Sequence, residues 1–133
     1  MSILTEEQKQ EMLDEFGRCL INKVRDGSLR LSMDIATLIT VNPGKREQYA
    51  VLSGLSFEQQ EAVCDLLSET ITDVIYRFIK MVEWRSDFIK LVLTKDGIEH
   101  NIVDVSEDVG SEICFLDDSG WIQRFSEVGR FVP

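Results

Sequence analysis

Apolar side chains recur at three- and four-residue intervals near the start of the chain, which is the spacing of an amphipathic helix. The recurring residues are Leu13, Phe16, Leu20 and Val24. Thr5 and Gln8 form a capping-box pattern ahead of them, and Asp26-Gly27 supplies a stop. The pattern predicts a helix over about residues 6–25 with a charged opposite face.

A longer helical pattern begins at Ser56, which forms a second capping box with Gln59. At 100° per residue, one side of this helix collects Val63, Leu67, Thr70, Val74 and Phe78, with Ile71 and Ile75 flanking them. The pattern predicts a long central amphipathic helix over about residues 57–82. We expect these residues to form its core face.

The stretch between these helices is ambiguous. Residues 29–35 alternate apolar and polar as in a strand, whereas Ile35, Leu38 and Ile39 have helical spacing. We favour a helix over about residues 32–41, capped by Ser32 and ended by Asn42-Pro43-Gly44. A short helix that ends at Gly54 is expected to follow.

The period of the pattern changes after Trp84. Two runs rich in β-branched and apolar residues, within about 87–105, meet at Asp96-Gly97, a dipeptide typical of a tight hairpin turn. A two-residue loop sets Leu91 opposite Ile102 and Lys90 opposite Val103. Because an isolated hairpin is only marginally stable, we expect this one to pack on the helices.

Two short helices are predicted in the C-terminal part, after the candidate caps Ser106 and Ser119. Trp121 and Phe125 are four residues apart and share a helix face, where with Ile122 they would close the core. No repeat or change of composition divides the chain. The sequence therefore predicts a single domain, residues 1–133, of the α+β class and mainly α.

Composition and charge narrow the classes of function. The chain is 44% hydrophobic and carries 24 acids against 14 bases, for a net charge of -10. This balance disfavours direct binding of nucleic acid or of an anionic membrane, and it favours a basic protein partner. We see no signal peptide and no apolar run of membrane-spanning length, so the expected location is cytoplasmic. Cys19, Cys64 and Cys114 are interpreted as buried thiols rather than as a disulfide framework.

The negative charge is concentrated in residues 96–118, which contain no lysine or arginine. The eight acids of this stretch are Asp96, Glu99, Asp104, Glu107, Asp108, Glu112, Asp117 and Asp118. The rest of the chain has 16 acids and 14 bases, so the stretch accounts for most of the net charge. We interpret these residues as a candidate partner-binding surface, and the alternative is that they are solvated carboxylates at loops and helix starts.

A second set of acids follows the long helix at four-residue intervals: Glu61, Asp65, Glu69 and Asp73. Like charges at this spacing repel each other, which suggests a site for a basic partner or a cation. The alternative is a solvated helix face opposite the core. The sequence Asp117-Asp118-Ser119-Gly120 resembles part of a calcium loop, but the alternating ligands of an EF-hand are missing, so we interpret it as a turn.

No catalytic, cofactor-binding or metal-binding residues are predicted. A di-iron carboxylate site needs Glu-x-x-His motifs on facing helices, and the only histidine, His100, falls in a predicted strand. Cys114 lies between apolar residues in an acidic stretch, where the pKa of a thiol rises. An enzyme or small-ligand protein with a pocket around His100, Trp84 and Trp121 is the alternative of a different class.

Two stretches together resemble a known family: LSGLSFEQQEAV, residues 52–63, and GSEICFLDDSGWIQRFS, residues 110–126. The pairing is similar to small, uncharacterised bacterial proteins with a Leu-Ser-x-Glu-Gln helix start and a C-terminal Gly-Trp-Ile-x-x-Phe-Ser motif. The resemblance implies a bacterial cytoplasmic protein and a helix over residues 32–41. It implies no activity, because none is assigned to that family.

Size, charge and the lack of a catalytic pattern favour a non-enzymatic, acidic protein-interaction module. Such a module could act as an inhibitor or immunity-type protein that masks the basic surface of a toxin or nuclease. A structural homodimer is a further alternative, formed through an apolar patch on the hairpin or on the helix from Arg46 to Leu52.

Overall fold

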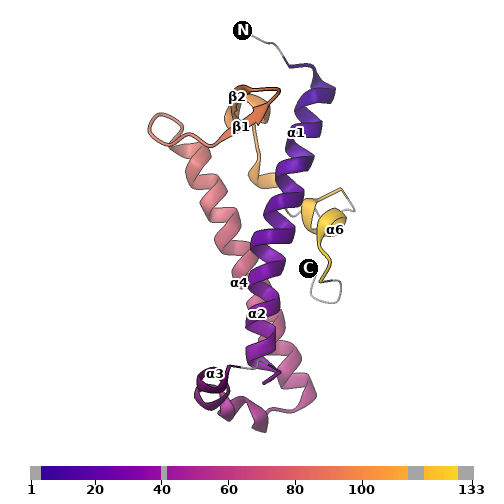
Figure 1. Ribbon diagram of the computed structural model, residues 1–133, viewed down its shortest axis with the longest axis vertical. Coiled ribbons are helices and arrows are strands. Elements are labelled where there is room, and N and C mark those ends of the chain that lie inside the picture. Colours follow the sequence, from indigo (N-terminus) through magenta and orange to yellow (C-terminus); the bar gives the residue numbers. More distant parts are fainter. Residues whose placement is uncertain (1–3, 40–41, 114–118, 129–133) are drawn as a thin grey trace.

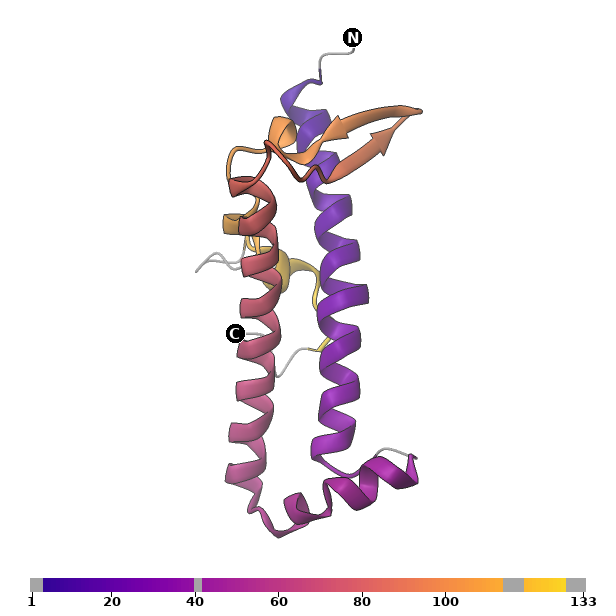
Figure 2. The ribbon, with the colours of Figure 1, turned by 90° about the vertical axis from the view of Figure 1, so that its left-hand side faces the viewer.

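Two long antiparallel helical rods dominate the computed structural model, which describes residues 4–39, 42–113 and 119–128. The protein is α+β and mainly α, with 69% of its residues in helices, one two-stranded hairpin and short C-terminal helices. Figure 2 shows the rods side by side, joined at one end by short helices, with the hairpin at the other end. The predicted fold class is confirmed.

The first rod is helical without a break from Glu6 to Ala36. It consists of α1 (Glu6–Cys19), a π-helical segment η1 (Leu20–Arg25) and α2 (Asp26–Ala36). The Thr5–Gln8 capping box is present, as predicted. The stop predicted at Asp26-Gly27 is wrong, because the Asp26 carboxylate is held by tertiary hydrogen bonds and Gly27 fits within the helix.

The connection between the rods contains α3 (Pro43–Gln48) and the 3₁₀-helical η2 (Ala50–Gly54). The predicted helix over 32–41 is wrong in both bounds, since α2 passes through Ser32 and ends at Ala36, followed by Leu38 with φ 58°. Asn42-Pro43 starts α3 rather than ending a helix: Asn42 accepts a hydrogen bond from the amide of Lys45, and proline suits the first helical position. The short helical turn ending at Gly54 is confirmed, although Gly54 is not among the residues with positive φ.

The second rod is α4 (Phe57–Trp84), and its capping box between Ser56 and Gln59 is formed as predicted. Its predicted core face is confirmed in part, because Ile75 is buried and Leu67 and Ile71 pack against the core. The buried residues of α4 are Cys64, Ser68, Thr72, Ile75, Ile79 and Val82. Val74 and Phe78 are instead 60% and 53% exposed. Small polar residues occupy the buried face because they bind a buried arginine, and an apolarity pattern does not reveal this role.

The hairpin consists of β1 (Val92–Lys95) and β2 (Ile98–Asn101), and it turns at Asp96 and Gly97, whose φ values are both positive. The predicted register is confirmed, because Val92 pairs with Asn101 and the amide of Ile102 donates to the carbonyl of Leu91. The strands are shorter than predicted. The chain turns into the helix α5 (Ile102–Val105) directly after Asn101, whose side chain caps it.

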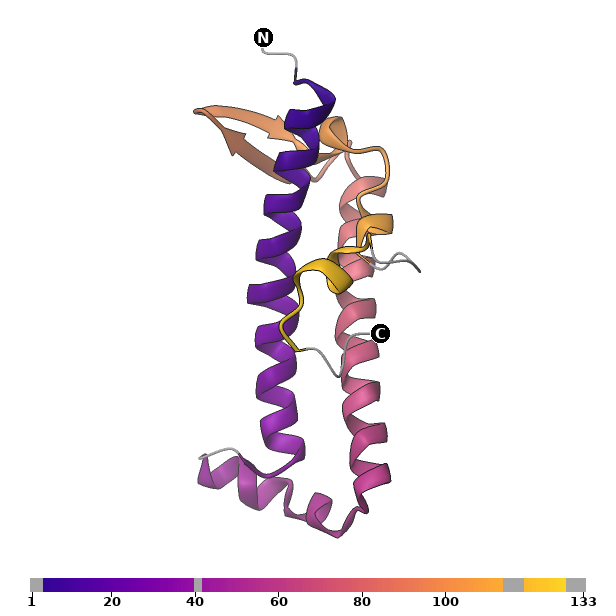
Figure 3. The same ribbon diagram turned by 90° about the vertical axis from the view of Figure 1, so that its right-hand side faces the viewer.

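The chain after α5 crosses one side of the two rods (Figure 3) and contains the 3₁₀-helical η3 (Gly110–Glu112) and α6 (Trp121–Phe125). Two short helices are thus confirmed, but their predicted caps are wrong. Ser106 ends α5, and the N-cap of α6 is Gly120. The main hydrophobic core lies where the first rod, α4, α5 and the C-terminal segment meet, and it includes Ile21, Ile79 and Ile102. Trp121 and Ile122 are completely buried in this main core and Phe125 is half-buried, as predicted.

A buried arginine fixes this C-terminal segment to both rods. Arg25 and Asp26 are completely buried and paired at 3.1 Å. Arg25 also donates to Thr72 (3.0 Å) and Ser68 (2.9 Å) on α4, while Asp26 accepts from the Ser126 hydroxyl (2.9 Å) and the Glu127 amide (2.7 Å). Removing one partner would leave the other charge buried without compensation. The network therefore joins the first rod, α4 and the C-terminal segment.

Gly17 allows Trp121 to approach α1. A Cβ atom at position 17 would lie 2.4 Å from the indole, which also packs edge-on against Phe16 at a centroid distance of 5.7 Å. Gly27, also helical, has no atom within 4 Å of such a Cβ. We expect Gly17→Ala to lower the free energy of unfolding by about 1–3 kcal/mol through overpacking.

The matched control Gly27→Ala should raise the free energy of unfolding by about 0.5–1 kcal/mol, because alanine favours the helix and meets no neighbour. Urea unfolding followed by circular dichroism measures both variants. Equal effects of the two substitutions would contradict the close packing of Trp121 on Gly17.

Candidate functional site

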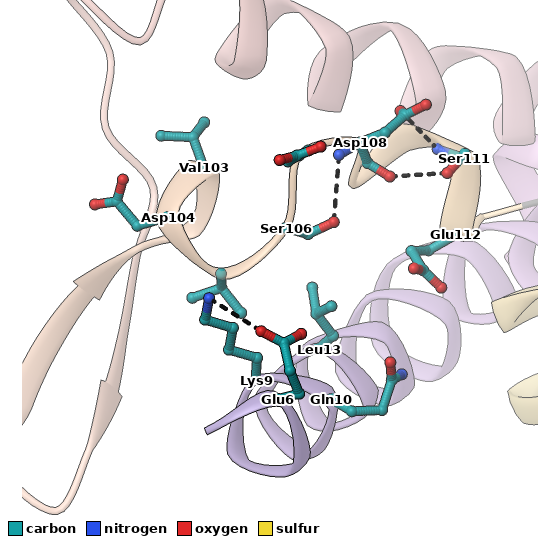
Figure 4. Close-up of a pocket in the computed structure, with 12 residues that line it drawn as sticks. Glu6, Lys9, Gln10, Leu13, Val103, Asp104, Ser106, Asp108, Ser111 and Glu112 are labelled. Atoms are coloured by element: carbon teal, nitrogen blue, oxygen red, sulfur yellow. Dashed lines mark hydrogen bonds and ion pairs between the residues drawn. The ribbon is translucent and has the colours of Figure 1, made fainter. Parts of the chain in front are cut away.

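An acidic groove lies between the start of α1 and the segment from α5 to η3 (Figure 4). Four of the eight predicted acids line it: Asp104, Glu107, Asp108 and Glu112. Glu6, from the opposite wall, adds a fifth carboxylate, and the groove has a volume of about 530 Å³. The single lysine or arginine among its described lining residues is Lys9, which lies 3.6 Å from Glu6.

Apolar residues in the α5–η3 segment orient the acids toward solvent. Ile102, Val105 and Val109 are buried in the main core, so the residues between them face outward. Asp104 lies on the exposed side of α5, and Glu107 follows it in the connection to η3. The alternation of buried apolar and exposed acidic residues thus places negative charge along the groove.

Local hydrogen bonds hold Asp108 in place. Its amide donates to the Ser106 hydroxyl (3.3 Å), and its carboxylate accepts from the Ser111 amide (3.2 Å). Lys80 of α4 lies 3.3 Å from the same carboxylate, so the charge of Asp108 is partly compensated. Lys80 also pairs with Glu83, which accepts from the Gly110 amide at 2.8 Å. These contacts fix one wall of the groove to α4.

Glu112, in η3, is partly buried at one end of the groove. Burial raises the pKa of its carboxyl, and the nearby Asp14 and Asp108 carboxylates raise it further against the opposing effect of Arg124. Arg124 does not neutralise Glu112 fully because it forms its own ion pair with Asp14 at 3.0 Å. The groove therefore has an excess of negative charge that a cationic ligand would relieve.

The other predicted acids of residues 96–118 do not join the groove. Asp96 is exposed at the hairpin turn, and Glu99 is exposed on β2 opposite Thr94. Asp117 and Asp118 lie outside the described residues. The sequence stretch thus divides between a groove and a projecting hairpin. Glu6 was missed by sequence reasoning, since no local pattern links residue 6 to a segment about 100 positions away.

The second acidic set winds around α4 instead of forming one row. A step of four residues turns a helix by about 40°, so the positions from Glu61 to Asp73 spread over about 120°. Asp65, Glu69 and Asp73 are exposed, and Asp73 pairs with Arg77 at 2.8 Å. Glu61 lies beside Cys64 in a cavity of about 210 Å³. The set therefore forms a winding row on one side of α4, and its role as a second docking surface stays a prediction.

The alternative pocket around His100 is not assembled in the described part of the chain. His100 is half-buried opposite Leu93, Trp84 is exposed at the end of α4, and Trp121 is buried against Phe16. None of the three lines the acidic groove or a second cavity of about 440 Å³ between α1 and β1. Among the described residues, no three His, Cys, Asp or Glu side chains form a group suited to a metal ion.

The cysteines differ from one another. Cys64 is buried, as predicted, whereas Cys19 is exposed and lines the cavity between α1 and β1, so its predicted burial is wrong. Cys114 lies outside the described residues. Within the described ranges, no helix combines the length and apolarity needed to cross a bilayer.

Glu112 provides a test of the groove's electrostatics. Because its pKa is raised in the folded protein, the folded state binds the proton more readily than the unfolded chain, and the ionised carboxylate costs stability at neutral pH. We expect Glu112→Gln to raise the free energy of unfolding at pH 7 by less than about 1 kcal/mol, since the groove is open to solvent.

The gain from Glu112→Gln should disappear as the pH falls through the folded-state pKa of Glu112 to below its ordinary value, where the wild-type carboxyl is protonated in both states. Urea unfolding of both proteins at a series of pH values measures this difference in the free energy of unfolding. A loss of stability at pH 7, or a gain that persists in acid, would contradict the excess of negative charge.

Comparison with protein-family models, curated proteins and solved structures finds no match to this chain. The resemblance to small bacterial proteins therefore remains a prediction from the two quoted motifs.

Proposed function

We propose that the protein is a non-enzymatic interaction module that binds a basic segment of another protein in the acidic groove. The observation that carries this proposal is the groove itself: five carboxylates from two distant parts of the chain, with Lys9 as the single cation among the described lining residues. Lysine and arginine side chains are the protein groups that complement such a surface.

The charge excess supports binding in two ways. Carboxylates at the rim attract a basic partner over a distance of about one Debye length, near 10 Å at moderate salt, and speed its association. A cation placed in the groove would offset the burial and the acidic neighbours that raise the pKa of Glu112. Recognition should therefore be fast and sensitive to salt.

An inhibitor or immunity-type role fits this chemistry. Proteins that act on nucleic acids present basic surfaces to the phosphate backbone, and an acidic protein can cover such a surface. The resemblance to small bacterial proteins supports placing this interaction in a bacterial cytoplasm. We accordingly propose a basic toxin or nuclease as the partner class.

A groove variant tests the proposal directly. The triple substitution Asp104→Asn, Glu107→Gln and Glu112→Gln removes three charges while sparing Asp108, which is needed for local hydrogen bonds. With the wild-type protein as bait in a lysate of its source organism, we expect a basic protein to be retained at low salt and released at high salt. The variant should retain at least about tenfold less of it, equivalent to about 1.4 kcal/mol.

The matched control removes the same number of charges, with the same types of substitution, from exposed positions of α4: Asp65→Asn, Glu58→Gln and Glu69→Gln. This control has the same net charge as the groove variant and should retain the partner as the wild type does. Equal loss in both variants would show that only total charge matters, and retention by the groove variant would contradict the proposed site.

A further inference from the structure

Lys80 of α4 connects the acidic groove to the second rod, although it is not among the described residues that line the groove. Its ammonium group lies 3.3 Å from Asp108 of the groove wall and 3.4 Å from Glu83 on its own helix. The second carboxylate oxygen of Glu83 accepts a hydrogen bond from the Gly110 amide at 2.8 Å. We name Lys80, Glu83, Asp108 and Gly110 the Lys80 clamp. The clamp ties the wall to α4 at two points.

The α4 side of the Lys80 clamp is shielded from solvent. The side chains of Lys80 and Glu83 are 17% and 10% exposed. The alkyl stem of Lys80 packs against the wall, because a Cβ atom on Gly110 would lie 2.6 Å from Cδ of Lys80. Salt screens partly buried pairs less than it screens exposed charges. The clamp should therefore persist at salt concentrations that weaken the attraction of a basic ligand to the exposed carboxylates.

The ammonium group of Lys80 changes a repulsion between the wall and α4 into an attraction. The Asp108 and Glu83 carboxylates both lie within 3.4 Å of its nitrogen, so their bonded oxygens are at most about 7 Å apart. Without the cation, these like charges would push the wall away from α4. Hydrogen bonds of Asp108 with Ser106 and Ser111 hold the turn of the wall itself (Figure 4), but they do not attach it to α4.

The clamped wall carries carboxylates that stand opposite α1. Glu107 directly precedes Asp108, Glu112 ends η3, and Glu6 lies on the other wall of the groove (Figure 4). The spacing of the carboxylates across the groove therefore depends on where α4 holds the wall. A cationic segment that contacts both walls binds more tightly when these groups are already in place, because binding then has no wall to order.

We propose that Lys80 is a positioning residue for cation binding in the acidic groove, acting through Asp108 and Glu83 rather than by contact with the ligand. The inference rests on the proposed function, because it assumes that the groove binds a basic segment. Its consequence is opposite to the effect of charge alone. Removing Lys80 makes the groove more negative, which by itself would strengthen the binding of a cation, whereas loss of the clamp weakens it.

Lys80→Met separates positioning from charge by the sign of its effect. The probe is a fluorescein-labelled hexalysine peptide, and fluorescence anisotropy at low salt measures its Kd. We expect Lys80→Met to raise the Kd about fivefold, since the wall must then be ordered on binding. Lys80→Arg, which keeps a cation between the two carboxylates, should restore the Kd to within about twofold of the wild type. The control Lys90→Met removes the same charge from an exposed lysine beyond α4 and should leave the Kd within about twofold.

Gly110→Ala disturbs the clamp without changing any charge, because the added methyl group displaces the stem of Lys80. We expect this variant also to raise the Kd for hexalysine. Amide hydrogen exchange of the free proteins supplies a readout that needs no ligand. Exchange of residues 106–112 should be faster in Lys80→Met and in Gly110→Ala than in the wild type, while residues 6–19 of the opposite wall keep their protection.

The outcomes distinguish the positioning role from the proposed function. Binding of hexalysine by the wild type that Lys80→Met leaves unchanged or tightens overturns the positioning role alone, as does unchanged exchange of residues 106–112. Absence of binding by the wild type, or equal binding by the wild type and the triple groove variant, overturns the proposed function and the positioning role together. Weaker binding by Lys80→Met, with recovery in Lys80→Arg, supports both.

Discussion

The buried pair of Arg25 and Asp26 is the interaction on which the rest of the structure depends. Arg25 donates to Ser68 and Thr72 of α4, and Asp26 accepts from Ser126 and the amide of Glu127. The two charges compensate each other within the first rod, but their other hydrogen bonds are formed only while all three parts of the chain are in place. A buried pair of this kind contributes little net stability compared with apolar packing, but breaking it is costly, so it specifies one arrangement.

This network determines which side of the rods is covered. It holds the end of the C-terminal segment against the first rod, while Trp121 packs on Gly17 and η3 is bound to α4 through Glu83. The segment therefore lies on one side of the two rods. The same segment carries Glu107, Asp108 and Glu112 of the groove, and Lys80 and Glu83 of α4 hold this wall in place.

Local signals in the sequence predicted much of the fold. The capping boxes at Thr5 and Ser56 and the turn at Asp96-Gly97 depend on neighbouring residues, and all three are confirmed together with the hairpin register. The continuity of the first rod could not be predicted. Asp26-Gly27 is a typical stop, and only tertiary partners of the Asp26 carboxylate reveal why the helix continues through it.

The prediction of the core face of α4 was wrong in part for a related reason. The apolar pattern selected Val74 and Phe78, whereas the buried face includes Ser68 and Thr72 because Arg25 requires their hydroxyl groups. The pattern identified the packed residues Ile71 and Ile75 but not the buried hydroxyl groups beside them. For the candidate site, the sequence identified Asp104, Glu107, Asp108 and Glu112, and it could not supply the opposing wall with Glu6.

The most direct measurement is amide hydrogen exchange of residues 119–128 in Asp26→Asn. This change keeps the size of the side chain but removes its charge, leaving Arg25 buried without a counter-charge. The account predicts faster exchange throughout these residues, including the Glu127 amide, and a loss of about 3–5 kcal/mol in the free energy of unfolding. Unchanged protection of residues 119–128 would contradict the central role of the pair.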